Sequence, residues 1–95
     1  MTYRVVFNQR SAKDFKKYLR QCAPKQRRQA HTIVESLRAD PRRGIGHKHP
    51  LEGPLRGYWA CKLDGSTCLL YTINDDEILV YVDRFSSDHY RDVHK

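Results

Sequence analysis

The chain has 95 residues, of which 39% are hydrophobic and 31% charged, and its formal net charge is +7. This length suits one compact domain, residues 1–95, with a modest core. No apolar run approaches the roughly 18–20 residues that cross a membrane, and the first residues lack the apolar segment of a secretory signal. An odd number of cysteines, Cys22, Cys61 and Cys68, favours reduced thiols. We therefore expect a cytoplasmic protein that makes no contact with a membrane.

The charge is unevenly divided along the chain. Residues 1–56 carry 14 Lys and Arg against 4 Asp and Glu, whereas residues 57–95 carry 4 against 7. A basic half of this strength attracts a polyanion, which indicates a nucleic acid or an acidic protein as partner. A solvated helical surface that keeps the chain soluble is the plain alternative.

The first half predicts one strand and two helices. Tyr3–Phe7 is rich in β-branched and aromatic residues and predicts a strand. Ser11 is expected to cap the first helix, and Pro24 suits the first turn of the second. Apolar residues follow at helical spacing in both. They are Phe15, Tyr18, Leu19 and Cys22, then Ala30, Ile33, Val34 and Leu37. Asp40-Pro41 ends the second helix.

The second half predicts a loop and three strands. Residues 41–57 contain four Gly and three Pro and form the loop. The strands expected are Tyr58–Leu63, Thr67–Ile73 and Ile78–Phe85, separated by short turns that make them antiparallel. Alternation places Trp59, Cys61 and Leu63 on one face of the first of these strands and Tyr58, Ala60 and Lys62 on the other face. In the last strand the same alternation groups Ile78, Val80, Val82 and Arg84.

These elements give an α+β fold of order β-α-α-β-β-β with an antiparallel sheet and a short C-terminal helix or turn. Two helices cover one face of such a sheet. We expect the other face to stay open, with Tyr58 and Lys62 on it.

A dense group of basic side chains lies in the loop: His47, Lys48, His49 and Arg56. Cleavage of RNA without metal needs a base for the 2′-OH, a cation for the phosphorane and an acid for the 5′-oxygen. Histidine suits both proton roles, and arginine binds phosphate in a bidentate manner. The loop therefore points to RNA cleavage without a cofactor or metal. A zinc site built from His47, His49 and one cysteine is an alternative.

The loop "HPLEGPLRGYW", the strand "CLLYTINDDEILVYV" and the ending "DRFSSDHY" resemble the RelE/ParE superfamily of toxins from bacterial toxin–antitoxin pairs. The loop is most similar to the YafQ type, and the final His-Tyr to the YoeB type. The resemblance implies a microbial RNase-like fold and cleavage of mRNA in the ribosomal A site. It also implies a cognate antitoxin that wraps the toxin, and a complex that binds operator DNA through the antitoxin.

The resemblance implies five catalytic residues. His49 matches a histidine of the YafQ-type string that takes part in proton transfer, and Lys62 matches a basic position on the second of the RelE strands. Arg84 and Tyr90 match an arginine that stabilises the scissile phosphate and a tyrosine that stacks on or activates the nucleotide. His89 precedes Tyr90 as in the YoeB type, where the histidine transfers a proton.

A second group is expected to hold the phosphates of mRNA and 16S rRNA: His47, Lys48, Arg56, Lys25, Arg27 and Arg28. Plain alternatives exist, since Arg56 could pair with Glu52, and Arg84 with Asp83 or Asp88. Two departures from the superfamily stand out. Cys68 replaces an arginine of RelE-type sequences, and Asp64 is the nearest match to an acidic residue of YafQ.

Three hypotheses remain open. The first is a ribosome-dependent mRNA endonuclease toxin that forms a 2′,3′-cyclic or 3′-phosphate and a 5′-OH. The second is a ParE-like inhibitor of DNA gyrase, which would not need the histidines, Lys62 or Tyr90. The third is a non-catalytic module that binds RNA or an acidic protein through the basic helices. The assembled basic residues favour the first.

Overall fold

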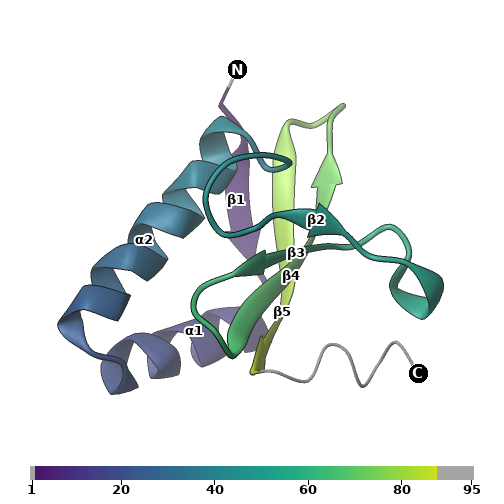
Figure 1. Cartoon of the computed structure of the whole chain (residues 1–95). Helices are drawn as coiled ribbons and strands as arrows, with labels where there is room; N and C mark the ends of the chain where they lie inside the picture. Colours follow the sequence, from purple (N-terminus) through teal and green to yellow (C-terminus); the bar gives the residue numbers. More distant parts are fainter. Residues whose placement is uncertain (1, 88–95) are drawn as a thin grey trace.

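The computed structural model describes residues 2–87 of the chain. Its elements are β1 (Arg4–Phe7), α1 (Gln9–Gln21), α2 (Pro24–Ala39), β2 (His49–Pro50), the 3₁₀ turn η1 (Gly53–Leu55), β3 (Trp59–Lys62), β4 (Thr67–Asn74) and β5 (Leu79–Ser87). The five strands form one sheet of order β1-β5-β4-β3-β2 (Figure 1). The predicted α+β order is confirmed. The C-terminal helix or turn, with His89 and Tyr90, lies outside the described residues.

The sheet is mixed rather than wholly antiparallel. Strands β2, β3, β4 and β5 pair antiparallel with their neighbours, as short turns require. Strand β1 instead pairs parallel with β5, with Val6 opposite Tyr81. The chain between β1 and β5, which includes both helices and β2 to β4, is far longer than the crossover that a parallel pair needs. Strand β2 is a two-residue extension of the sheet that the Gly- and Pro-rich loop did not predict.

The start of α1 differs from the prediction. Asn8, not Ser11, is the N-cap, because its side-chain oxygen accepts a hydrogen bond from the Ser11 amide at 2.7 Å. Ser11 lies buried in the first turn, where its hydroxyl donates to the carbonyl of Val82 at 2.9 Å. The Asn8 amide also donates to the carbonyl of Asp83. Both side chains therefore tie the helix to β5.

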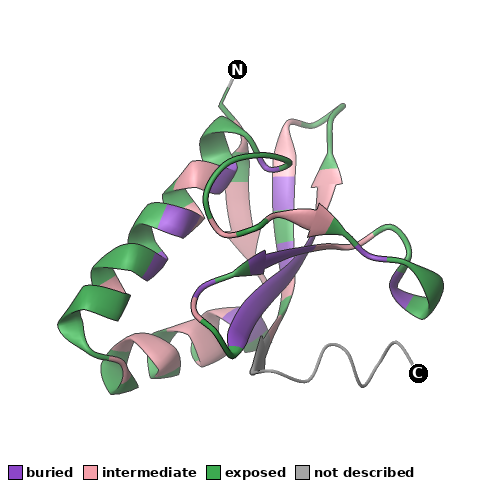
Figure 2. Cartoon of the chain, in the orientation of Figure 1, coloured by how far each residue is buried: buried purple, intermediate pink, exposed green. Residues whose placement is uncertain are grey.

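The main core lies between the helices and one face of the sheet. Ala30, Ile33 and Leu37 of α2 are buried as predicted, and Phe15, Tyr18 and Leu19 of α1 pack against the same cluster. The sheet contributes Cys61, Leu63, Leu69, Tyr71, Val80 and Val82. Figure 2 shows this buried band along α2 and through β3 to β5. Among the described residues, no helix is long and apolar enough to cross a membrane.

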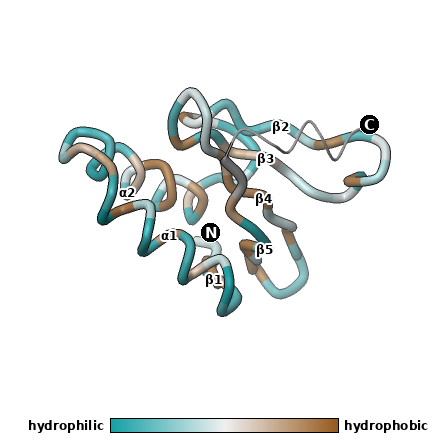
Figure 3. Tube along the Cα trace, turned by 90° about the horizontal axis from the view of Figure 1, so that it is seen from below, coloured by the Kyte–Doolittle hydropathy of each residue, from teal (hydrophilic) through white to brown (hydrophobic). Residues whose placement is uncertain are grey.

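The second face of the sheet is partly covered, so the expectation of an open face is correct only in part. Leu51 and Leu55 form a smaller buried cluster with Ala60, Cys68 and Leu70. They come from the segment between β2 and β3, which Figure 3 shows on the far side of the strands from both helices. We call the two sides the helix-covered face and the loop-covered face.

A β-bulge in β5 changes which residues point to which face. Tyr71 pairs with Val82, but Leu70 pairs with Arg84, so Asp83 is an extra residue. One extra residue moves all following side chains to the opposite face. Phe85 therefore packs against the main core, and Arg84 lies on the loop-covered face. The prediction that Arg84 shares a face with Val80 and Val82 is wrong for this reason.

Candidate nucleic-acid site

The sheet brings three of the predicted catalytic residues to one face. His49 lies opposite Ala60, Ala60 opposite Leu70, and Leu70 opposite Arg84. Residues that oppose each other in a sheet project from the same face. Lys62 follows Ala60 by two residues on β3 and therefore also projects from the loop-covered face. The bulge at Asp83 is what gives Arg84 its place in this row.

The row has His49 at one end and Arg84 at the other, with Ala60 and Leu70 between them. Ala60 and Leu70 are buried, whereas Lys62 and Arg84 are exposed. His49 and Arg84 are three strand spacings apart, about 14 Å at the usual distance between strands. A backbone separation of this size leaves room for one RNA phosphodiester between the two side chains.

The ring of His49 is oriented by the loop that carries it. Its Nδ1 lies 2.9 Å from the carbonyl oxygen of His47, and a carbonyl only accepts, so Nδ1 carries the hydrogen. In the neutral ring the basic lone pair then resides on Nε2. A histidine with a fixed tautomer is suited to take a proton at that nitrogen.

Lys48, between the two histidines, points away from the row. Its ammonium donates to the hydroxyl of Ser36 at 2.9 Å and to the carbonyls of Asp40 at 3.0 Å and Arg43 at 2.7 Å. These bonds use its three N–H donors, and burial lowers the pKa of this ammonium. The contacts favour a structural role, in which Lys48 fastens the loop to the C-terminal end of α2, over the expected contact with RNA.

Arg84 forms an ion pair with Asp83, which was the alternative to a catalytic role for this arginine. Its Nε lies 3.2 Å from a carboxylate oxygen of Asp83, and the Arg84 side chain is 47% exposed. An exposed pair of this kind is weak, so a phosphate can replace it. Arg56 follows η1 and is exposed on the surface segment that covers the second face. His47 is exposed in the loop before β2.

The basic residues of α2 lie elsewhere. Lys25 and Arg28 are exposed near the turn between the helices. Arg27 is half-buried, and its guanidinium donates to the carbonyls of Leu19 and Cys22 at the end of α1. Figure 1 shows this turn on the opposite side of the molecule from η1. The two predicted RNA-binding groups, helical and loop, are therefore separate surfaces.

Asp64, the nearest match to an acidic residue of YafQ, builds the turn between β3 and β4. It accepts hydrogen bonds from the Tyr18 hydroxyl at 2.7 Å and from the amides of Ser66 and Thr67. Burial alone would raise the pKa of this carboxyl, but these hydrogen bonds outweigh it and hold the pKa below its usual value. Asp64 is thus a charged turn residue joined to α1.

The zinc alternative has no support in the described part of the chain. Within residues 2–87, no three His, Cys, Asp or Glu side chains gather closely enough to hold a metal ion. Cys61 and Cys68 are buried in the two cores, and burial raises the pKa of both thiols, to about 12 and about 11. Thiols in that state are poor metal ligands and poor nucleophiles at neutral pH.

The same fold occurs in solved toxin structures. The YoeB/ParE toxin from Agrobacterium tumefaciens matches with a TM-score of 0.76 at 18% identity, over 88% of this chain and 96% of that chain. The toxin in the toxin–antitoxin complex RelBE2 from Mycobacterium tuberculosis matches with a TM-score of 0.69 at 23% identity, over 92% and 99%. These likenesses show that the chain shares the fold of these toxin structures.

The sequence narrows this class to one family. The family model described as "YoeB-like toxin of bacterial type II toxin-antitoxin system" matches residues 7–90, and the chain belongs to that family. Toxin YoeB of Mycobacterium bovis is 36% identical over 53 residues, 56% of this chain and 62% of that protein. Toxin YoeB of Synechocystis is 36% identical over 59 residues, which are 62% of this chain and 65% of that protein. The matched segment thus spans less than two thirds of these relatives.

Proposed function

We propose that this protein is a toxin that cleaves mRNA on the ribosome and that a cognate antitoxin neutralises it. The observation that carries the proposal is the arrangement of His49, Lys62 and Arg84 on the loop-covered face. Membership of the YoeB-like toxin family supports it. A gyrase inhibitor has no need of a histidine and two cations placed along one face.

The reaction proposed is attack of the 2′-oxygen on the adjacent phosphorus. His49 takes the proton of the 2′-OH at Nε2 as the O2′–P bond forms. Arg84 and Lys62 stabilise the added negative charge of the phosphorane. The P–O5′ bond then breaks, and a proton goes to the 5′-oxygen, which leaves a 2′,3′-cyclic phosphate and a 5′-OH. His89 and Tyr90 lie outside the described residues. They stay predicted, His89 for proton transfer and Tyr90 to stack on or activate the nucleotide.

Binding of the ribosome is assigned to a different surface. Lys25 and Arg28 are exposed beside the turn between the helices, and this region belongs to the basic half of the chain. Contacts between such residues and rRNA phosphates are electrostatic and weaken as salt rises. The same charge suits an antitoxin rich in acidic residues, and solved relatives include toxin–antitoxin complexes such as YoeB-YefM from Staphylococcus aureus. Binding of operator DNA is proposed to go through the antitoxin.

The test is induced expression in bacteria, with growth and mRNA 5′ ends measured together. The site variant is His49→Ala/Lys62→Ala/Arg84→Ala. The control variant, His31→Ala/Lys13→Ala/Arg38→Ala, removes one residue of each type from exposed positions on the helices. We expect the wild type and the control to stop growth and to cut mRNA within codons, and the site variant to do neither. Growth arrest with intact mRNA, or a site variant as active as the control, would contradict the proposal.

A further inference from the structure

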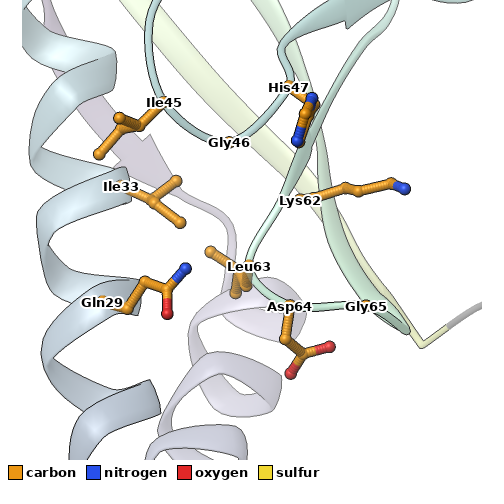
Figure 4. A pocket seen from close by; sticks show the side chains of 9 residues that line it. All are labelled: Gln29, Ile33, Ile45, Gly46, His47, Lys62, Leu63, Asp64 and Gly65. Atoms are coloured by element: carbon orange, nitrogen blue, oxygen red, sulfur yellow. The ribbon is translucent and has the colours of Figure 1, made fainter.

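A pocket of about 470 Å³ lies between α2 and the end of β3, next to the candidate site (Figure 4). One wall is α2, with Gln29 and Ile33. The other is the turn after β3, with Leu63 and Asp64, and the loop residues Ile45 to His47 close one end. This volume is within the range of small-molecule sites, about 300–1,000 Å³, and it accommodates one nucleobase.

The floor of the pocket is apolar. Ile33 and Leu63 are almost fully buried beneath it, and Ile45 at the rim is 49% exposed. Among the described residues, Ile45 is one of two large hydrophobic side chains left exposed, the other being Tyr81. A flat heterocyclic ring placed here would cover Ile45 and remove apolar surface from water.

Two polar side chains on the walls of the pocket, Gln29 and Asp64, can accept hydrogen bonds from a ligand. Gln29 presents an amide, which both donates and accepts, and Figure 4 shows it on the wall facing Leu63. Asp64 presents a carboxylate, which only accepts. Its Oδ2 takes one hydrogen bond, from Tyr18, and a carboxylate oxygen has room for a second. A ligand edge that carries N–H donors therefore fits this pair better than an edge of carbonyls alone.

The pocket is continuous with the cations of the candidate site. The stem of Lys62 lines it, while its ammonium points away from Gln29 and Ile33 (Figure 4). His47 lines the pocket from the loop, two residues before His49. A nucleotide whose base enters the pocket thus has its phosphate near the Lys62 ammonium.

We propose that this pocket binds one unpaired nucleobase of the RNA substrate, next to the scissile phosphate, and selects a base with an exocyclic amino group. The inference rests on the proposed endoribonuclease function and adds a specificity site to it. Gln29 and Asp64 are the selecting residues, and Ile45 covers one face of the ring. Single-stranded RNA suits such a site because its bases are unstacked and present their edges.

The test uses the ¹⁵N-labelled full chain and two mononucleotides, CMP and UMP. They share ribose and phosphate and differ at the base edge, where cytosine carries an amino group and an acceptor N3 and uracil carries a carbonyl and an N3–H. Phosphate binding to basic surfaces therefore cancels between them. We expect CMP to shift the amide resonances of Gly46, Leu63 and Gly65 with an affinity about tenfold higher than that of UMP, the lower part of the discrimination usual for such pairs. Gln29→Leu should abolish this difference.

Gln21→Leu is the matched control, since Gln21 is also exposed on a helix but lies outside the pocket. It should keep the preference for CMP. Three results would overturn the inference. They are equal affinities for CMP and UMP, resonance shifts confined to the helices, and pocket resonances that respond only to an antitoxin peptide. Mononucleotide binding does not require cleavage. If the protein cuts mRNA but no mononucleotide binds in the pocket, the inference about base binding is overturned and the proposed function is not. Binding here without mRNA cutting overturns the proposed function alone.

Discussion

The helix-covered and loop-covered faces of the sheet bury their apolar residues on different scales. On the first, the part of the chain that the structure describes (residues 2–87) has a cluster of nine buried residues from α2 and the sheet, with ten further hydrophobic residues packed around them. On the second, within the same residues, Leu51 and Leu55 form a cluster with Ala60, Cys68 and Leu70, and Tyr58 packs against it. The candidate cations all border the smaller cluster. One face therefore supplies most of the stability, and the other leaves charged side chains accessible to a substrate.

The largest expected effect compares one leucine from each face. Leu69→Ala removes a fully buried side chain from the main core and should lower the free energy of unfolding by about 4 kcal/mol. Leu55→Ala, at the solvent-facing edge of the small cluster, should cost about 2 kcal/mol. Urea denaturation measures both. RNA cleavage, assayed where both variants are folded, should fall more for Leu55→Ala. Equal costs would show that the two clusters act as one core.

A second comparison uses two glycines with positive φ. A Cβ at Gly46 (φ +91°) would lie 2.6 Å from the Cys61 sulfur and 3.1 Å from Ile33 Cγ2, whereas a Cβ at Gly57 (φ +100°) meets nothing within 4 Å. Gly57→Ala should therefore cost only backbone strain, about 1 kcal/mol. Gly46→Ala adds a steric clash, for a total of about 3 kcal/mol. Thermal unfolding of the two variants isolates the clash, and equal melting temperatures would rule it out.

Lys62 separates activity from stability on the loop-covered face. Lys62→Ala should lower mRNA cleavage about a hundredfold, which corresponds to about 2.7 kcal/mol of transition-state stabilisation. Its free energy of unfolding should stay within about 0.5 kcal/mol of wild type, because the side chain is exposed. Lys13→Ala, an exposed lysine on α1, is the control and should leave both quantities unchanged. Cleavage by Lys62→Ala at the wild-type rate would remove Lys62 from the site.

The smallest effect concerns acid. The pKa of Asp64 lies below its usual 3.8 in the folded chain, so the stability it contributes is present above that value and is lost as the pH falls below it. The loss should be small because the group is only partly buried. Asp64→Asn keeps the shape and removes the titration. Melting temperatures measured between about pH 6 and pH 3 should fall less steeply for the variant than for wild type. Parallel curves would assign the acid sensitivity to other carboxyls.

Local patterns in the sequence predicted much of the fold. The apolar spacing in α1 and α2, Pro24 at the start of α2 and Asp40 at its end are all confirmed. The alternation in β3 correctly separated Cys61 and Leu63 from Ala60. These features follow from short-range geometry, because helix and strand periods repeat within a few residues. The resemblance to the RelE/ParE superfamily, and not periodicity, selected His49 and Lys62 as candidates for the site, and alternation in β3 gave only the face of Lys62.

Other features depend on contacts between distant parts of the chain, and only the tertiary structure decided them. The bulge at Asp83 gives Arg84 its face, and it arises in the pairing of β5 with β4. The direction of Lys48 is set by Ser36 and the end of α2, twelve residues earlier, and Asn8 caps α1 while bonding to β5. The parallel pairing of β1 with β5 joins residues about 75 positions apart. Sequence periodicity determined which residues are apolar and where elements lie, whereas hydrogen bonds between elements determined which charged side chains share a face.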